Sequence, residues 1–143
     1  MEFIYNMIQE PGIEFVDSSE VHRFPGYSLF MRRDNIIELH FENGFSGSVG
    51  DARNMVRLFK KLRGRFKPSL LVICSEDNTF SKEAREYTAS KEVSDVLKAD
   101  AFVIRGLALR IIGNGYLKIN RPSRPTRLFN SKEEAIDWLK RID

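Results

Sequence analysis

Charged and aromatic side chains gather between residues 76 and 87, just after an apolar run at 70–74. The run is short and continuous, as expected for a strand that is covered on both faces. Open α/β sheets usually place their binding sites beyond the carboxyl ends of such strands. We therefore take this segment as the candidate binding site, formed by Glu76, Asp77, Phe80, Ser81, Arg85 and Tyr87.

Two kinds of chemistry are open to these residues. A carboxylate of Glu76 or Asp77 could act as a base while Arg85 clamps an oxyanion, but any charged loop offers such a set. In a binding surface, Phe80 would be the apolar anchor and Arg85 the directional polar contact, because aromatic residues and arginine dominate binding hot spots. We favour binding and predict that the protein is not an enzyme.

Motifs for catalysis or for cofactor binding are missing. The two histidines, His22 and His40, stand near no nucleophile motif, and the sequence has no HxxxH, CxxC or acidic ligand cluster. The glycine-rich stretch 43–50 precedes a helix but lacks the lysine and the spacing of a P-loop. We interpret it as a flexible connection with Ser48 or Asp51 as the helix cap, and we predict no metal and no cofactor.

Length and composition indicate one domain. The chain has 143 residues, of which 42% are hydrophobic, enough to bury a core. The lone Cys74 lies in an apolar run and is expected to be a small buried side chain. No signal peptide or membrane-spanning stretch is evident, so we expect a cytoplasmic protein without membrane insertion. The domain is predicted to span 1–143, with 1–12 as a loose extension.

The charge is nearly balanced but unevenly distributed. The formal net charge is +3, yet residues 53–67 carry basic side chains and no acid. A second basic cluster comprises Arg121, Arg124 and Arg127. These clusters could contact phosphates, but no aromatic residue is interleaved to stack on bases, so we do not expect nucleic-acid binding.

The amino-terminal half predicts a β-hairpin. Segments 27–33 and 36–42 are rich in aromatic and β-branched residues and flank Asp34 and Asn35, which tolerate the positive φ of a tight turn. Apolar and polar residues alternate along 37–42, which predicts one face on a core and one facing water. A short strand at 13–16 is also possible from the sequence.

Helices and strands alternate in the remainder of the chain. Helical spacing covers 52–62, Ser81 is placed to cap a broken helical segment, and a strand is expected at 101–104. Segment 107–119 alternates like a strand at first but is long enough for a helix, which we favour. A strand at 126–129 and a helix after the Ser131 capping box end the chain. A layered α/β sandwich around a mixed sheet follows.

This order of elements resembles the STAS/SEC14-like group, also called SpoIIAA-like. The resemblance covers about residues 27 to 142. It rests on the 70–74 strand with its loop, on Ala84-Arg-Glu-Tyr87, on Ala99-Asp-Ala101, and on Pro125-Thr-Arg-Leu-Phe129 followed by Ser131-Lys-Glu-Glu-Ala-Ile-Asp-Trp-Leu139. Resemblance in fold is not resemblance in function.

The resemblance implies a regulatory domain that binds partner proteins. Some family members are controlled by serine phosphorylation near the start of the helix after a core strand. Ser81 is the nearest match in position, but the family's acidic-Ser-Ser-Gly pattern is absent, and we read Ser81 as a helix cap. We therefore expect a regulatory module that binds another protein or a second copy of itself.

The alternative is a module for a small molecule or lipid, with its pocket at the carboxyl end of the central strands. Phe80, Tyr87 and Tyr116 could line that pocket. A closed apolar pocket of several hundred cubic ångströms would favour the ligand, whereas a flat loop surface would favour the protein partner.

Overall fold

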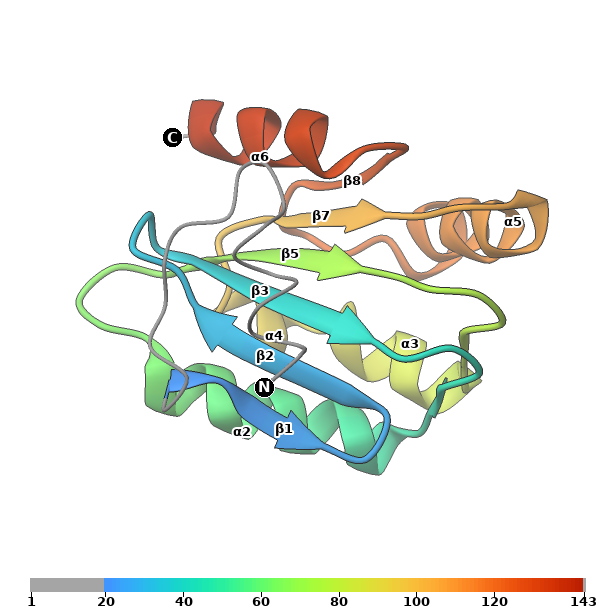
Figure 1. The fold of residues 1–143 in the computed structure, drawn as a ribbon, viewed down its shortest axis with the longest axis horizontal. Helices are drawn as coiled ribbons and strands as arrows, with labels where there is room; N and C mark the ends of the chain where they lie inside the picture. Colours follow the sequence, from blue (N-terminus) through green and yellow to red (C-terminus); the bar gives the residue numbers. More distant parts are fainter. Residues whose placement is uncertain (1–19, 143) are drawn as a thin grey trace.

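The computed structural model describes residues 20–142. In this part of the chain a main sheet of six strands has the order β1-β2-β3-β5-β7-β8 (Figure 1). Strand β2 is antiparallel to both of its neighbours, β1 and β3, and β3, β5, β7 and β8 run parallel. Their bounds are β1 His22–Phe24, β2 Tyr27–Met31, β3 Ile36–Phe41, β5 Ser69–Ile73, β7 Asp100–Val103 and β8 Thr126–Phe129. The mixed sheet is confirmed; the strand predicted at 13–16 lies outside the described residues.

The predicted hairpin is formed by β2 and β3. Met31 faces Ile37 across the ladder, and the Arg32 N–H donates to the Ile36 carbonyl at 2.8 Å. Asn35 has a φ of 62°, the left-handed conformation that an asparagine adopts more readily than most residues. The hairpin and the positive φ at Asn35 are confirmed, but Asp34 does not share that conformation, and the turn between Arg32 and Ile36 has three residues.

Helices cover both faces of the main sheet. On one face lie α2 Val49–Leu62, α3 Lys82–Thr88, α4 Lys91–Ser94, α5 Leu107–Gly115 and the π-helical segment η2 Tyr116–Asn120. On the other face α6, Lys132–Arg141, packs on β5, β7 and β8. Segment 107–119 is thus helical, and the layered α/β architecture is confirmed.

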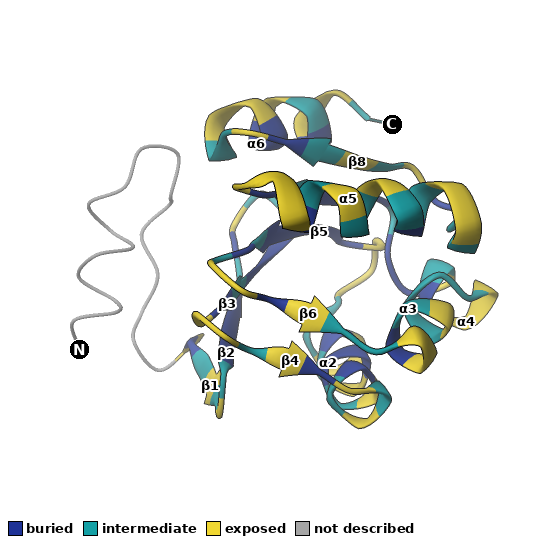
Figure 2. Ribbon diagram, turned by 90° about the vertical axis from the view of Figure 1, so that its right-hand side faces the viewer, coloured by how far each residue is buried: buried dark blue, intermediate teal, exposed yellow. Residues whose placement is uncertain are grey.

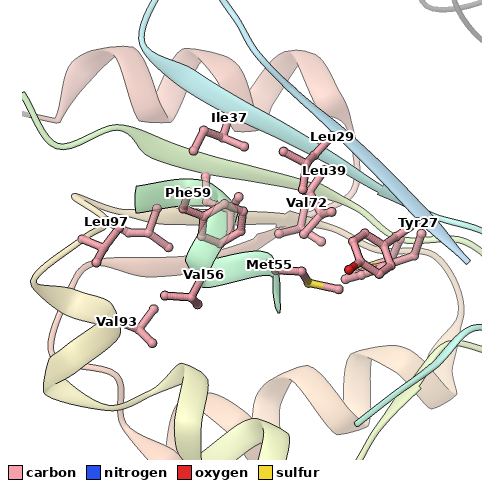
Figure 3. Packing of buried hydrophobic residues seen from close by; sticks show 14 of the residues in the cluster. Tyr27, Leu29, Ile37, Leu39, Met55, Val56, Phe59, Val72, Val93 and Leu97 are labelled. Carbon is pink, nitrogen blue, oxygen red and sulfur yellow. The ribbon is translucent and has the colours of Figure 1, made fainter. Parts of the chain in front are cut away.

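Helix α2 follows from its sequence. Ser48 caps it, and the Ser48 side chain and Asp51 exchange hydrogen bonds with each other's backbone N–H groups in a capping box. Ala52, Met55, Val56 and Phe59 recur at helical spacing and are buried against the sheet. Figure 3 displays this packing, with Met55 and Phe59 beside Leu39 and Val72.

A small second sheet was not predicted. Strand β4, Ser46–Gly47, pairs in parallel with β6, Thr79–Phe80. It joins the loop before α2 to the loop before α3, and both loops follow the carboxyl ends of neighbouring strands of the main sheet. Burial is greatest in the inner strands β2, β3, β5 and β7, whereas β4, β6 and much of α5 have exposed residues (Figure 2).

The expectation that the polar face of β3 faces water is wrong at Glu38. Its side chain is fully buried and contacts Arg32 Nη1 at 3.0 Å and Lys132 Nζ at 2.8 Å. His40 Nε2 lies against the second carboxylate oxygen. The alternation of apolar and polar residues assigned the side chains of β3 to the correct faces of the sheet. It could not show that the polar face is covered, or that Arg32 and Lys132 surround the Glu38 carboxylate.

Candidate functional site

The loop between β5 and β6 is held firmly to the loop after β3. Asn78, which is buried, accepts a hydrogen bond from the Ser75 N–H at 2.7 Å and donates to the Glu42 carbonyl at 2.9 Å. Asn43 accepts from the Glu76 N–H at 3.1 Å. The sequence analysis missed Asn78, although asparagine is a common turn residue. The loop presents a fixed backbone.

Three of the predicted site residues meet at the start of α3. The Ser81 hydroxyl accepts from the Ala84 N–H at 3.1 Å, so the predicted cap is confirmed. Arg85 Nη1 donates to the Phe80 carbonyl. The Phe80 ring lies with its centroid 5.1 Å from that of Phe41 and is half-buried. Phe80 and Arg85 are therefore engaged within the fold rather than displayed on a flat loop.

The other three predicted residues lie elsewhere. Glu76 and Asp77 are exposed, and Asp77 sits at the turn with a φ of 58°. Tyr87 contacts other helices: its hydroxyl donates to Glu92 at 2.9 Å, and Arg53 of α2 lies over its ring. Burial and the nearby Glu92 carboxylate raise the pKa of Tyr87 to about 12.

A cavity of about 120 Å³ lies between the main sheet and helices α2, α3 and α5. Of the three residues predicted to line a pocket, Phe80 and Tyr116 line this cavity and Tyr87 does not; Arg85, predicted for the loop surface, lines it too. Most of the remaining lining is aliphatic or aromatic. It comprises Leu39, Phe41, Ala52, Met55, Val56, Phe59, Leu70, Val72, Phe102, Leu109, Ile112 and Leu128, among others. Apolar surroundings of this kind exclude water and accept apolar guests.

The cavity extends further than the sequence indicated. Cys74 lies just past the carboxyl end of β5, whereas Asp100 begins β7 and pairs with Leu70 near the amino end of β5. Both residues line the same cavity. The site therefore runs beneath the strands, from their carboxyl ends to their amino ends, and is not confined to the carboxyl edge.

A buried ion pair lies beside this cavity. Arg124 donates to Asp100 Oδ2 from Nε at 2.9 Å and from Nη2 at 2.7 Å, and both side chains are almost fully buried. The other bonds of the guanidinium go to the Ser94 hydroxyl at 2.9 Å and the Thr88 carbonyl at 2.7 Å. Burial raises the pKa of the Asp100 carboxyl, and Arg124 offsets part of that rise.

The role of Arg124 corrects the sequence analysis. The sequence placed Arg124 with Arg121 and Arg127 in a cluster that could contact phosphates, but Arg124 is buried and forms an ion pair with Asp100. Arg121 and Arg127 are exposed. The sequence did not indicate a role for Asp100, the partner of Arg124, beyond the start of a strand. An acidic residue next to an apolar strand is the feature that could have indicated a buried, paired carboxylate.

Cys74 is buried as predicted, and burial raises the pKa of its thiol to about 12. The thiolate that nucleophilic chemistry needs is therefore scarce at neutral pH. Among residues 20–142, no group of three or more His, Cys, Asp or Glu side chains is arranged to hold a metal ion. Within the same residues, no helix is both long and apolar enough to cross a membrane.

Comparison with known proteins identifies the fold. A family model described as a domain of unknown function, DUF7793, matches residues 30–143. The crystal structure of an uncharacterized DUF3478-family protein from Shewanella loihica PV-4, with a SpoIIAA-like fold, superposes with a TM-score of 0.55 at 17% identity. The match covers 80% of this chain and 94% of that one. The predicted SpoIIAA-like fold is thereby confirmed. The comparison with curated proteins gave no match.

Proposed function

The chain belongs to the DUF7793 family, and we propose that this domain is a non-catalytic binding module that holds a small apolar ligand in the cavity beneath its main sheet. The observation that carries the proposal is the cavity itself, about 120 Å³ with a mostly hydrocarbon lining. Protein interiors are otherwise packed with few voids larger than a water molecule. An engineered apolar cavity of roughly 150 Å³ stays dry and binds benzene or xenon, so this one is of a size for a compact apolar guest.

The cavity also sets an upper limit on the ligand. A volume of about 120 Å³ does not enclose a phospholipid. A whole lipid would need the helices to move apart, whereas a compact aromatic or alicyclic molecule would not. We therefore prefer a small molecule to the lipid ligand that the SEC14-like resemblance implies.

Thermal unfolding with and without benzene or indene tests the proposal. A ligand that binds only the folded state, present at ten times its Kd, raises the stability by about 1.4 kcal/mol. Ala84 is buried and lines the cavity, so Ala84→Leu should fill it and abolish the shift. Ala108 is exposed and does not line it, and Ala108→Leu should leave the shift unchanged. A protein whose unfolding neither ligand shifts would contradict the proposal.

Protein binding is the second candidate function, and exposed aliphatic residues favour it. Leu107 and Ile111 of α5 and Ile119 of η2 are 74%, 62% and 80% exposed. No acidic side chain occurs between residues 101 and 132. A second copy of the chain is the partner we consider, because the exposed acids Glu76 and Asp77 of one copy complement the basic surroundings of α5 in the other.

Light-scattering mass across a concentration series tests this second candidate. A dimer that Ile111→Ser dissociates would support docking through α5, and one that Phe80→Ala dissociates would support the sequence-predicted surface at Glu76, Asp77, Phe80, Ser81, Arg85 and Tyr87. A monomer throughout would contradict self-association. Turnover that depends on Glu76 or Arg85 would contradict the non-catalytic part of the proposal.

A further inference from the structure

Strand β8 is an open edge of the main sheet, because it is last in the strand order and pairs with β7 alone. The carbonyls of Pro125 and Phe129 accept hydrogen bonds from the β7 side at 2.9 and 3.0 Å. Since successive residues of a strand alternate, Thr126 and Leu128 direct their backbone N–H and C=O groups away from β7. Among residues 20–142 no backbone hydrogen bond reaches these groups, apart from bonds within regular elements. Such an edge is a template for another strand.

The edge lies in a groove of about 390 Å³ between α5 and α6 (Figure 2). Charged side chains of both signs line the groove, namely Arg110, Arg127, Arg141, Glu134 and Asp137. The ion pairs of the described residues involve none of these five. A surface that carries unneutralised charges of both signs complements a second copy of itself better than a partner of one sign.

We propose that two copies of the chain associate by pairing their β8 edges antiparallel, which joins the two main sheets into one continuous sheet. The contact is isologous, with the same groups contributed by both copies about a two-fold axis. This interface goes beyond the proposed ligand binding, and it differs from docking through the exposed aliphatic residues of α5.

The charge of Arg127 selects the register of the two strands. With Leu128 opposite itself, the two Leu128 residues exchange N–H···O bonds, and Arg127 lies opposite Phe129 of the second copy. Arg127 already stacks over the Phe129 ring of its own chain, 5.3 Å from the ring centroid, so an aromatic neighbour suits it. Pairing Thr126 with Leu128 would instead set the two Arg127 side chains directly opposite each other, which is destabilising.

The charges on α6 fit the same two-fold axis. Glu134, Asp137 and Arg141 are spaced by three and four residues and therefore share one flank of the helix. An axis perpendicular to the sheet sets the two α6 helices antiparallel on one face, so Glu134 of one copy is directed towards Arg141 of the other. Helix α6 packs mainly on β7. Three strand spacings separate β7 from its counterpart, which places the helix axes about 14 Å apart. Helices with their side chains are about 10–12 Å across, so extended Glu and Arg side chains can meet.

Amide hydrogen exchange, measured residue by residue by NMR along a light-scattering concentration series, tests the inference on the whole chain. The mass should approach that of a dimer as the concentration rises. Over the same range the exchange of the Thr126 and Leu128 amides should slow at least about tenfold. The Arg127 and Phe129 amides face β7 and should be protected even at the lowest concentration, so they are the internal control.

A charge exchange on α6 provides the matched variants. Arg141→Glu sets two acids against each other and should raise the dimer Kd about tenfold, because the two-fold axis repeats each lost pair. The double variant Glu134→Arg with Arg141→Glu exchanges the two charges and should restore the wild-type Kd. Lys61→Glu alters the net charge as much as Arg141→Glu does, but on the exposed face of α2, and should leave the Kd unchanged.

Four results would overturn the inference. They are a monomer at every concentration, a dimer in which the Thr126 and Leu128 amides exchange as fast as in the monomer, slow exchange of these amides already in the monomer, and a double variant that dimerises as weakly as Arg141→Glu. The second result would assign the dimer to another surface, such as α5. None of the four bears on the apolar cavity, which the binding of benzene and indene tests separately.

Discussion

Lys132 Nζ lies 2.8 Å from the buried carboxylate of Glu38, although 94 residues separate them in the sequence. Lys132 begins α6 and Glu38 lies in the middle of β3, so the contact ties the last helix to the amino-terminal hairpin. Arg32 and His40 contact the same carboxylate. This network joins parts of the chain that the order of elements does not bring together.

Lys132→Met should destabilise the fold by about 1–3 kcal/mol, because it removes a charged hydrogen bond from a buried acceptor that keeps its other partners. Urea unfolding at neutral pH measures the change. Lys82 is the control: it is exposed and pairs with Glu86 on its own helix, so Lys82→Met should alter the stability by less than about 0.5 kcal/mol. Equal effects of the two substitutions would contradict a structural role for the Glu38 network.

Glu38 should also make the stability depend on pH. Burial alone would raise the pKa of Glu38, but the hydrogen bonds and charges of His40 and Lys132 outweigh it and lower the pKa to about 2. In the unfolded chain the carboxyl titrates near its ordinary value of 4.5. Between these values the unfolded state binds a proton that the native state does not, so stability is lost as the pH falls from about 4.5 to about 2.

The loss from Glu38 amounts to roughly 3 kcal/mol over that range, since one pKa unit corresponds to about 1.4 kcal/mol. Urea unfolding at pH 6, 4 and 3 measures it. Glu38→Gln should be less stable at pH 6 and should flatten the curve, whereas Glu42→Gln, at an exposed acid next to β3, should keep the slope of the wild type. A wild-type slope in Glu38→Gln would show that other carboxyls control acid unfolding.

The Cys74 thiol should react slowly with a disulfide reagent in the native protein and quickly in urea. Its burial and its pKa of about 12 leave little thiolate at pH 8, and the side chain is shielded from reagents. Absorbance of the released thiolate measures the rate. Because Cys74 lines the cavity, a bound ligand should slow the native reaction further, and rapid stoichiometric labelling without urea would contradict this prediction.

Local patterns in the sequence predicted the elements that depend on neighbours along the chain. The turn residue Asn35, the cap Ser81 and the apolar spacing of α2 each act within a few residues, and each was found where expected. The five-residue segment 70–74 was readable as a covered strand because its burial on both faces leaves an unbroken apolar run.

Contacts between residues far apart in the chain could not be predicted from the sequence. Arg124 looked like a surface cation until its pairing with Asp100, 24 residues away, was known. Phe80 looked like an exposed anchor because its neighbours are polar, yet its ring is directed at Phe41 and Phe45. The cavity results from how α2, α3 and α5 pack on the sheet, and no periodicity within one element reports on that.

Gly47→Ala should destabilise the protein by about 1–3 kcal/mol, the usual cost of overpacking. A Cβ atom at Gly47 would lie 2.8 Å from Cδ1 of Phe80 and 3.2 Å from Cε2 of Phe45, so the rings would have to move. Gly64 has open space around the same position and an ordinary φ, and Gly64→Ala should change the stability by less than about 0.5 kcal/mol. Urea unfolding of both variants provides the comparison.

The same substitution also links β4 to the cavity. Phe80 lines the cavity, so a shift of its ring changes the cavity wall near α3. Gly47→Ala should therefore weaken the binding of indene as well as lower the stability, while Gly64→Ala should leave binding unchanged. If Gly47→Ala lost stability but bound indene with the wild-type Kd, the ring of Phe80 would not shape the site, and the ligand would have to lie deeper beneath β5 and β7.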